Sequence, residues 1–335
     1  MTLRVGLVGA GVMGQTHAAG WARTPARLAA VFAADRLQAE AISNKYRAAQ
    51  VDSLEALIDQ VDVVDICTPT HLHYAMVLQA AAAGKQVICE KPLARTLAQG
   101  REMVQACREA GVRLLVGHVV RFFPEYALAR QMVERGDIGR VAVVRLTRCS
   151  FQPRLAADNW FLDHERSGGM MLDLMIHDFD YARWVAGDVE SVFARNVSSQ
   201  DPNAPTDYGL ALLRHCNGAL SNIEGGWAYP PPMFRTALEI AGDAGLIEHP
   251  ADSSVPLGVH LKKAADDAGP DVGLPLSPLA EDPYVTEIRH FYDVLTTPGM
   301  TPRVTAEDGL AALQIALAAI ESARTGRRVT LEALS

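Results

Sequence analysis

The sequence predicts an α/β domain built on a doubly wound parallel sheet, followed by an α+β domain with an open, mainly antiparallel sheet. Up to about residue 120, short runs of Val, Ile, Leu and Ala alternate with helical patterns, as in parallel strands that helices cover on both faces. After residue 140, one strand pattern follows another with turn signals between them, which indicates antiparallel pairing. We therefore expect two domains, at residues 1–121 and 122–335.

The strands expected in the first domain are Arg4–Val8, Leu28–Ala33, Val61–Ile66, Gln86–Cys89 and Arg113–Val116. Helices are expected between them. Thr96 followed by Gln99 has the spacing of a capping box at a helix start. Gly84 and Gly111 stand where helices would end. This alternation predicts right-handed crossovers between parallel strands.

The strands expected in the second domain are Val141–Arg148, Val189–Val197, Asp207–His215, Leu220–Ala228, Arg235–Ala241 and Leu246–His249. Asn217–Gly218 between two of them is a hairpin signal. One helix from about Gly169 to Ala186 interrupts the strands, and a last helix is expected from about Thr305 to Gly326. The segment Lys262–Pro283 is rich in Asp, Gly and Pro and predicts a long loop.

Composition narrows the class of function. The formal net charge of −8 argues against nucleic acid and anionic membrane surfaces as partners, because both need clustered Lys and Arg. No apolar run approaches a membrane span, and the first residues lack a signal-peptide pattern. The five cysteines form no CxxC pair and the histidines form no metal motif. We expect a cytoplasmic protein with reduced cysteines and no bound metal.

A glycine-rich loop follows the first strand and opens a helix; it consists of Gly9, Ala10, Gly11, Val12, Met13 and Gly14. Gly9 allows a tight turn, Gly11 lets the backbone approach a pyrophosphate, and Gly14 lets the helix pack close to the strand. The helix N-terminus then offers N–H groups to the anion. The GxGxxG spacing in this setting predicts a dinucleotide-binding, or Rossmann, domain that takes NAD or NADP.

The ribose-reading position after the second strand is ambiguous. An acid there binds a ribose 2′-hydroxyl and favours NAD, whereas a basic side chain accepts the 2′-phosphate of NADP. The chain places Asp35 next to Arg36, so the two residues argue in opposite directions, and the alternative for either is a solvated loop charge. Because Asp35 is an acid, we prefer NAD as the cofactor.

Lys91 lies between Glu90 and Pro92 at the end of the strand Gln86–Cys89. Ligands of open parallel sheets bind beyond the carboxyl ends of the strands, where cofactor and substrate would meet. Pro92 stiffens the backbone at Lys91, which helps to aim an ammonium group. The alternative is an ordinary surface lysine.

Asp173 and His177 stand four residues apart on the predicted helix after Gly169, so the spacing puts both on one face. A carboxylate beside an imidazole can orient the ring and fix its tautomer, which suits general acid–base chemistry. The alternative is an exposed helix pair worth a few tenths of a kcal/mol.

Further candidates lie near the carboxyl ends of later strands. Thr68, Pro69, His71 and His73 follow the strand Val61–Ile66, and the two histidines either line the cofactor site or cap a helix. Arg121 follows the last strand of the first domain and binds either a substrate hydroxyl or an internal carboxylate.

Two aromatic residues of the second domain complete the set of candidates. Trp160 and Tyr284 offer a face or a hydroxyl to a sugar, with core or interface packing as the alternative.

These segments together resemble one family, the Gfo/Idh/MocA oxidoreductases, named after glucose–fructose oxidoreductase, inositol dehydrogenase and a rhizopine-catabolism protein. The similarity runs over almost the whole chain. The matching segments are GAGVMG at 9–14, CTPTHLH at 67–73, GKQVICEKPLA at 84–94, GHVVRF at 117–122, SGGMMLDLMIHDFDYARWVAGD at 167–188 and AEDGLAALQIALAAIESARTGRRV at 306–329.

The resemblance implies that Lys91, Asp173 and His177 match the family's catalytic lysine, aspartate and histidine, and that the Lys91–Pro92 bond is cis. It implies oxidation of a secondary alcohol of a sugar, sugar derivative or cyclic polyol, with either His177 or Lys91 as the proton acceptor. It also implies a homodimer or homotetramer formed through the C-terminal sheet. The chain departs from the family at Ala33 and Ala34, where many members have an acid or a Ser-Arg pair.

Other functions remain open at this level. Some relatives use bound NAD transiently to cleave glycosides, and a non-catalytic dinucleotide-binding regulator or a dehydrogenase of a non-carbohydrate such as a dihydrodiol is also compatible. The residues of Phe151–Arg166 and Pro230–Phe234 carry no spacing that names a substrate.

Overall fold

A computed structural model describes residues 2–154, 159–199, 206–249 and 281–333. These residues form two compact units: 2–122 with 281–310, and 123–249 with 311–333. The chain leaves the first unit next to the boundary expected at 121 and 122. It returns for residues 281–310, which the sequence analysis assigned to the second domain. Most of the expected loop Lys262–Pro283 lies outside the described residues.

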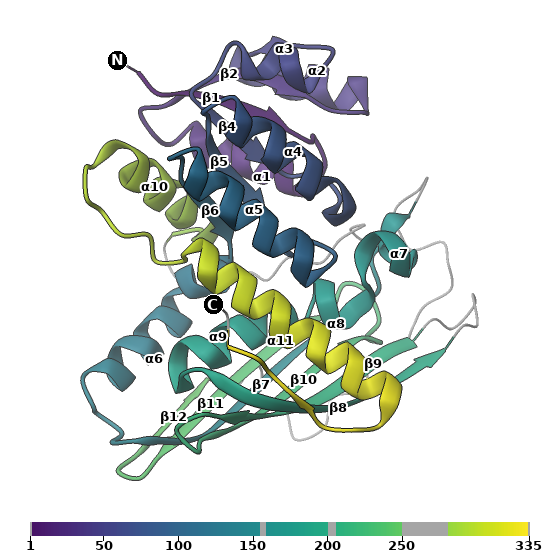
Figure 1. The fold of residues 1–335 in the computed structure, drawn as a ribbon, viewed down its shortest axis with the longest axis vertical. Coiled ribbons are helices and arrows are strands. Elements are labelled where there is room, and N and C mark those ends of the chain that lie inside the picture. The colour runs from purple at the N-terminus through teal and green to yellow at the C-terminus, as the bar shows by residue number, and fades with distance from the viewer. Residues whose placement is uncertain (1, 155–158, 200–205, 250–280, 334–335) are drawn as a thin grey trace. The chain divides into compact units, whose positions relative to one another are not determined.

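The first unit is a six-stranded parallel sheet (Figure 1). Its strands are β1 (Arg4–Val8), β2 (Arg27–Phe32), β3 (Ala49–Gln50), β4 (Val63–Ile66), β5 (Gln86–Glu90) and β6 (Leu114–Gly117), in the order β3-β2-β1-β4-β5-β6. Its helices are α1 (Val12–Trp21), α2 (Arg36–Tyr46), α3 (Leu54–Ile58), α4 (Thr70–Ala82), α5 (Leu97–Glu109), the 3-10 helix η1 (Val119–Phe122) and α10 (Pro283–Thr296). This confirms the predicted doubly wound α/β fold.

Helix α10 explains why residues 281–310 belong with the N-terminal unit. Its buried side chains Ile288, Phe291 and Val294 join the same hydrophobic cluster as Trp21 at the end of α1. A Cβ on Gly20 would lie 2.8 Å from Cγ1 of Ile288, so glycine allows the two helices to approach closely. Apolar burial on the sheet's own helix layer therefore outweighs continuity along the chain.

The second unit contains a seven-stranded, mainly antiparallel sheet, as predicted. Its strands are β7 (Val141–Ser150), β8 (Val189–Ser199), β9 (Thr206–His215), β10 (Leu220–Trp227), β11 (Phe234–Gly242), β12 (Leu246–His249) and β13 (Val329–Thr330), in the order β12-β11-β7-β10-β9-β8-β13. Strands β7 and β10 pair in parallel, and the other neighbours are antiparallel. Helix α6 (Pro124–Glu134) precedes the sheet, and α11 (Ala306–Thr325) carries the chain from the first unit into the second.

One face of this sheet is covered and the other presents apolar side chains. Helices α8 (Gly169–Asp173) and α9 (Ile176–Ala186) pack over β7, β9 and β10 (Figure 1). On the opposite face Leu210, Leu212 and Leu220 are about half exposed. Alternation along each strand produces this division, because successive side chains point to opposite faces.

The single helix expected from Gly169 to Ala186 is wrong in detail. The structure has two helices, α8 and α9, with Leu174 and Met175 between them. The amide of Met175 donates to the carbonyl of Met170, five residues earlier, so one turn is widened. Such π-type turns break the regular spacing of side chains on a helix face.

Two further predictions concern the membrane and the cysteines. In the part of the chain that the structure describes, no helix has the length and apolarity needed to cross a membrane. All five cysteines are free thiols; four are buried, and Cys216 is exposed rather than packed.

Candidate functional site

The carboxyl ends of three neighbouring parallel strands bring the predicted residues of the first unit to one edge of the sheet. Strand β1 pairs with β4 and β4 with β5, with Val8 opposite Ile66 and Ile66 opposite Cys89. The segments that follow these strands hold the glycine loop, Thr68 and Lys91. Sequence positions 9, 68 and 91 therefore meet because the strands are parallel and adjacent.

The glycine loop has the backbone that the sequence requires. Gly9 has φ +99°, and a Cβ there would lie 2.5 Å from the carbonyl oxygen of Cys67. A Cβ on Gly14 would collide with the carbonyl of Gly9. A Cβ on Gly11 would meet nothing within 4 Å, so the space above this residue is open. Two glycines are needed for internal packing, and the third leaves room for a ligand.

Helix α1 presents an anion-binding end beside this loop. Its N-cap residue is Gly11, no side chain caps it, and its first turn, beginning with Val12 and Met13, contains no acid. The first amides of a helix have no intrahelical acceptor, and the helix dipole adds positive potential there. The residues present therefore fit a dinucleotide pyrophosphate.

Asp35 and Arg36 both have structural contacts. Asp35 is the N-cap of α2: its Oδ1 accepts from the amides of Leu37 and Gln38 at 3.0 and 3.1 Å. Its Oδ2 accepts from the side-chain amide of Gln38 at 2.9 Å. Arg36 forms an exposed ion pair with Asp52. Strand β2 ends at Phe32, so Asp35 begins the next helix rather than ending the strand.

His73 ties the ends of β4 and β5 together. Its ring is fully buried, with Nε2 2.8 Å from the carbonyl of Thr68 and Nδ1 2.9 Å from the carbonyl of Pro92. Burial lowers the pKa of His73. The N-cap residue of α4 is Pro69, and no side chain caps this helix, so neither His73 nor the half-buried His71 has the capping role considered above.

Lys91 follows β5 and is half-buried, and its bond to Pro92 is cis, as the family resemblance implied. The amide of Lys91 donates to Oε2 of Glu90 at 3.1 Å. The carboxylate of Glu90 is itself buried, and Gly117 on β6 leaves the space for it: a Cβ there would lie 2.8 Å from Oε1 of Glu90. The position of the Lys91 main chain therefore depends on a buried carboxylate.

The carboxylate of Glu90 belongs to a cluster that the sequence analysis missed. His17 on α1 is fully buried, with Nδ1 3.0 Å from both oxygens of Asp65 and Nε2 3.0 Å from Oε1 of Glu90. The indole N–H of Trp21 donates to Oδ2 of Asp65 at 2.7 Å. Glu287 on α10 is also fully buried.

Charge interactions shift the pKa values of this cluster. Burial is the largest single influence on the pKa of His17 and lowers it, but the charge and hydrogen bond of Asp65 together with the interaction with Cys67 outweigh burial and hold that pKa well above its ordinary value. Burial raises the pKa of Glu287 well above its ordinary value, and the neighbouring charges of Glu90 and Asp65 raise it further. Burial also raises the pKa of the Cys67 thiol.

In the second unit, Asp173 ends α8 and His177 lies in the first turn of α9. Asp173 is buried and His177 is half-buried. The two residues are therefore separated by the widened turn at Leu174 and Met175, not by one regular helical turn.

A buried ion pair anchors the helix that carries His177. The guanidinium of Arg148 on β7 donates to both oxygens of Asp178, at 2.7 and 3.1 Å, and both side chains are fully buried. Burial raises the pKa of Asp178, and Arg148 opposes this shift. The bidentate pair fixes α9 on the sheet one residue from His177.

Comparison with known proteins identifies the family. Residues 3–118 match the model described as oxidoreductase family, NAD-binding Rossmann fold, and residues 126–248 match the GFO/IDH/MocA C-terminal domain. The chain belongs to the Gfo/Idh/MocA oxidoreductases. Its N-terminal unit is thus a NAD-binding Rossmann domain.

Relatives and solved structures of this family cover the whole chain. Inositol 2-dehydrogenase of Rhizobium meliloti (strain 1021) is 30% identical over 99% of this chain and 100% of the relative. Myo-inositol 2-dehydrogenase of Thermotoga maritima is 31% identical over 98% of this chain and 99% of the relative. Levoglucosan dehydrogenase, solved with NADH and levoglucosan, superposes with a TM-score of 0.83 at 25% identity, covering 98% of this chain and 99% of the other.

In this Gfo/Idh/MocA oxidoreductase, Arg121 contacts an internal carboxylate, one of the two alternatives considered. Its side chain is 1% exposed, and Nη1 donates to Oδ2 of Asp308 at 3.1 Å and to the carbonyl of Arg303 at 2.9 Å. The sequence could not choose between the alternatives, because Asp308 lies 187 residues away.

The two aromatic candidates of this Gfo/Idh/MocA member lie in different units. Trp160 is half-buried and stacks on Phe161, with 4.1 Å between ring centroids. Tyr284 is buried on α10 of the first unit, whereas the sequence analysis expected it in the second domain.

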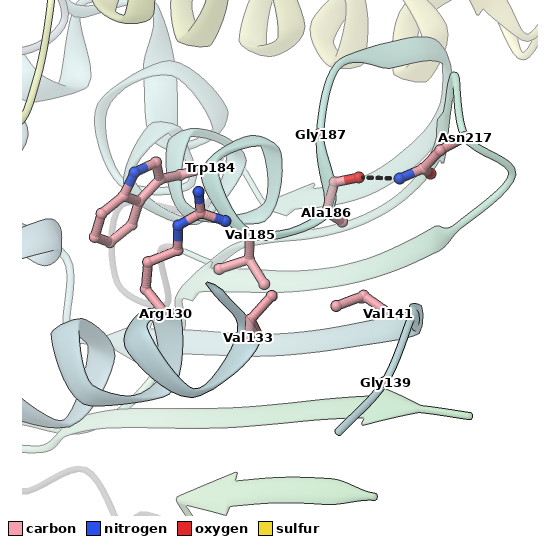
Figure 2. Close-up of a pocket in the computed structure, with 9 residues that line it drawn as sticks. All are labelled: Arg130, Val133, Gly139, Val141, Trp184, Val185, Ala186, Gly187 and Asn217. Atoms are coloured by element: carbon pink, nitrogen blue, oxygen red, sulfur yellow. Dashed lines mark hydrogen bonds between the residues drawn. The ribbon is translucent and has the colours of Figure 1, made fainter. Parts of the chain in front are cut away.

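A hollow of about 360 Å³ lies in the second unit of this oxidoreductase, between α6, the start of β7 and the end of α9 (Figure 2). Figure 2 shows Arg130 beside the ring of Trp184 and the side-chain amide of Asn217 bonded to the carbonyl of Ala186. None of the predicted site residues lines this hollow.

Proposed function

We propose that this protein is a NAD(P)-dependent dehydrogenase that oxidises a secondary alcohol of a sugar, sugar derivative or cyclic polyol. The observation that carries the proposal is the shared edge of the parallel sheet, where the glycine loop, Thr68 and Lys91 follow the adjacent strands β1, β4 and β5. Relatives named for inositol, levoglucosan, 1,5-anhydrofructose and apiose support the substrate class.

The first unit holds the dinucleotide in this proposal. The amides of residues 9–14 and the open space at Gly11 receive the pyrophosphate, and Thr68, Pro69 and His71 form the neighbouring wall, which the buried His73 supports from behind. Glu90 and Arg121 act behind this wall as buried supports. When bound, NAD supplies the hydride acceptor at its nicotinamide ring.

Lys91, Asp173 and His177 are the proposed catalytic residues. Lys91 donates a hydrogen bond to the reacting oxygen and stabilises the negative charge that develops on it. His177 takes the hydroxyl proton from the same oxygen, and Asp173 orients the His177 ring. The same scheme also works with Lys91, instead of His177, as the group that accepts the hydroxyl proton.

We expect NAD rather than NADP as the preferred cofactor. Asp35 keeps an acid near the ribose-reading position even though it caps α2. Separate fluorescence titrations of the protein with NADH and NADPH test this preference. Tighter binding of NADPH, abolished in Arg36→Glu, would reverse it.

The exposed face of the second unit's sheet supports the proposed homodimer or homotetramer. Phe193 on β8 lies opposite Leu212 on β9, and both are exposed, as are Leu210 and Leu220. Several exposed large apolar side chains on one face of a sheet are typical of an interaction surface. Light scattering with size-exclusion chromatography tests it; Leu212→Asp should shift the assembly towards the monomer.

The activity test is a screen for NAD⁺ and NADP⁺ reduction at 340 nm against inositols, hexoses, uronates, amino sugars, levoglucosan and other anhydro sugars, and apiose. Lys91→Met and His177→Asn should each lower kcat on the active substrate by about a hundredfold or more. Lys85→Met is the matched control, since Lys85 lies before β5, at the opposite end from Lys91, and donates to the carbonyl of Val61. We expect the control to keep near-full turnover.

The same screen separates the competing functions. Near-full turnover in Lys91→Met or His177→Asn would refute the assignment of the catalytic residues. Glycoside turnover with retained cofactor and no net NADH formation would replace the dehydrogenase with an NAD-assisted hydrolase. NADH binding without turnover of any compound would favour a dinucleotide-binding regulator.

A further inference from the structure

A buried cluster of ionisable side chains lies directly behind Lys91. His17, Asp65, Glu90 and Glu287 come from α1, β4, β5 and α10, all within the first unit. Each is buried, and His17, Asp65 and Glu287 are fully so. None of them touches the reacting atoms in the mechanism above, so their presence needs another explanation.

The hydrogen-bond pattern around His17 suits a doubly protonated ring. Asp65 accepts from the indole N–H of Trp21 as well as from the ring of His17. Glu90 accepts from the amide of Lys91 through Oε2 and faces His17 Nε2 through Oε1. When Asp65 and Glu90 are both carboxylates, both ring nitrogens of His17 donate to them, and the raised pKa of His17 agrees with a doubly protonated ring. His17 is therefore an imidazolium between two carboxylates.

The remaining titratable groups that face His17 are neutral. Cys67, just after β4, has its sulfur 3.7 Å from Oδ1 of Asp65, and burial raises the pKa of its thiol. The carboxyl of Glu287 has no hydrogen-bond partner among the described residues, and burial keeps it protonated. His17 is thus the cation that balances Asp65 and Glu90.

His17, Asp65 and Cys67 also place one ligand atom each within 4.8 Å of one another, which invites comparison with a metal site. Their geometry is that of a hydrogen-bond network. Both oxygens of Asp65 already contact N–H donors, at 2.7 and 3.0 Å. A metal ion bound to Asp65 would lie against these N–H protons, so the arrangement does not suit a metal site.

We propose that His17 is a positioning residue for Lys91: its imidazolium holds the Glu90 carboxylate, and that carboxylate holds the main-chain amide of Lys91. The proposal rests on the function proposed for Lys91. It extends the site from the edge of the sheet to α1, the helix that also receives the cofactor. Removing His17 leaves two buried carboxylates without their cation, so Glu90 is no longer held in place and its hold on the Lys91 amide weakens.

The first test reads the His17 ring directly. In the ¹⁵N-labelled full-length protein, the two ring nitrogens of an imidazolium give similar ¹⁵N shifts, whereas a neutral ring gives two well-separated shifts. The His17 signals are those lost in His17→Gln. We expect the imidazolium pattern from pH 6 to pH 8, and a neutral ring at pH 7 would overturn the proposal.

The second test is kinetic and uses a matched control. His17→Gln should lower kcat about tenfold to a hundredfold and leave the KM for the dinucleotide nearly unchanged. His215→Gln is the control, since His215 is also fully buried and bonds the carbonyl of Gly187 and the hydroxyl of Ser221, but lies in the second unit's sheet. Equal losses of kcat in the two variants would reduce His17 to a stability role and overturn the proposal.

A third variant separates charge from shape. Asp65→Asn keeps the size of the side chain and removes the charge that favours the imidazolium, so His17 loses its proton near neutral pH. We expect kcat of Asp65→Asn to fall as pH rises through 7 and to recover towards pH 6, while wild type shows no such step. Absence of this step would contradict the proposal. If Lys91→Met kept full turnover, the catalytic role proposed for Lys91 would fail, but the ring signature of His17 would be unaffected.

Discussion

Two buried ion pairs, one in each unit, stand next to the proposed catalytic residues, and they are built differently. In the first unit, His17 holds Glu90, which precedes Lys91. In the second unit, Arg148 holds Asp178, which follows His177. In both, a buried carboxylate adjacent in sequence to a catalytic candidate is fixed by a cation from another element.

The cations differ in how they respond to pH. Arginine stays charged throughout the range in which proteins are folded, and its planar group binds both oxygens of Asp178 at once. Histidine is charged only while its neighbours keep it so, and the first unit surrounds it with Asp65, Glu90 and the neutral Glu287. The second unit therefore has a permanent anchor, and the first unit has one that depends on the protonation of several groups.

The largest effect on stability is expected when the buried ion pair of Arg148 and Asp178 in the second unit is broken. Arg148→Met leaves Asp178 buried and without its cation, which should lower the free energy of unfolding by about 3–5 kcal/mol. Urea denaturation at pH 7 measures this loss. Arg145→Met on the same strand removes an exposed ion pair with Glu239 and should cost less than about 1 kcal/mol. Similar losses in both variants would mean that burial of the Arg148 pair contributes nothing.

A smaller effect is expected when Gly117 on β6, which leaves space for the Glu90 carboxylate, is replaced. Gly117→Ala places a methyl group only 2.8 Å from Oε1 of Glu90, closer than two such atoms normally approach. Because His17 and the Lys91 amide both hold this carboxylate, it cannot move freely, and we expect a loss of about 1–3 kcal/mol together with a lower kcat. Unchanged stability and turnover in Gly117→Ala would show that the Glu90 carboxylate can move away from the methyl group without cost, which would contradict this prediction.

The smallest effect is expected for Glu287→Gln at pH 4, where the wild-type carboxyl is neutral in the folded protein and mostly neutral in the unfolded chain, so stability should change by less than about 0.5 kcal/mol. The folded protein keeps the Glu287 proton to a higher pH than the unfolded chain does. Wild-type stability therefore falls as pH rises above the ordinary glutamate value, until the raised folded pKa is reached. The variant lacks this loss and should gain on wild type by at most about 1.4 kcal/mol per pH unit.

Urea midpoints of both proteins from pH 4 to pH 9 test this dependence. His17 acts in the same direction in both proteins: its pKa is raised, so its contribution is complete below about pH 6.5 and decreases as pH rises towards the folded pKa. A constant difference between variant and wild type would show that Glu287 is ionised in the folded protein.

The sequence was most informative where a local steric rule links residue type to backbone. Gly9 needs a positive φ and Gly14 needs the absence of a Cβ, so their spacing predicts the loop without any knowledge of the fold. Strand β5 and the Lys91–Pro92 segment follow from an apolar run and a proline in the same way. The uncapped N-terminus of α1 is likewise a property of adjacent residues.

Sequence patterns failed where the outcome depends on contacts between distant elements. The spacing of Asp173 and His177 predicts one helix face, but the turn between them is widened at Leu174 and Met175. The pairing of Arg121 with Asp308 and the return of α10 to the first unit depend on residues more than 180 positions apart. A single sequence carries no local signal for such pairs.

By itself, the sequence therefore determined the two fold classes, the dinucleotide loop and the presence of Lys91 at a strand end, because these follow from periodicity and backbone sterics over short stretches. Only the tertiary structure decided that His17, Asp65 and Glu90 form one buried network behind Lys91, and that Arg148 fixes the helix of His177. Burying a charge is unfavourable unless an opposite charge is brought to it, and that partner can come from any element that the fold places alongside.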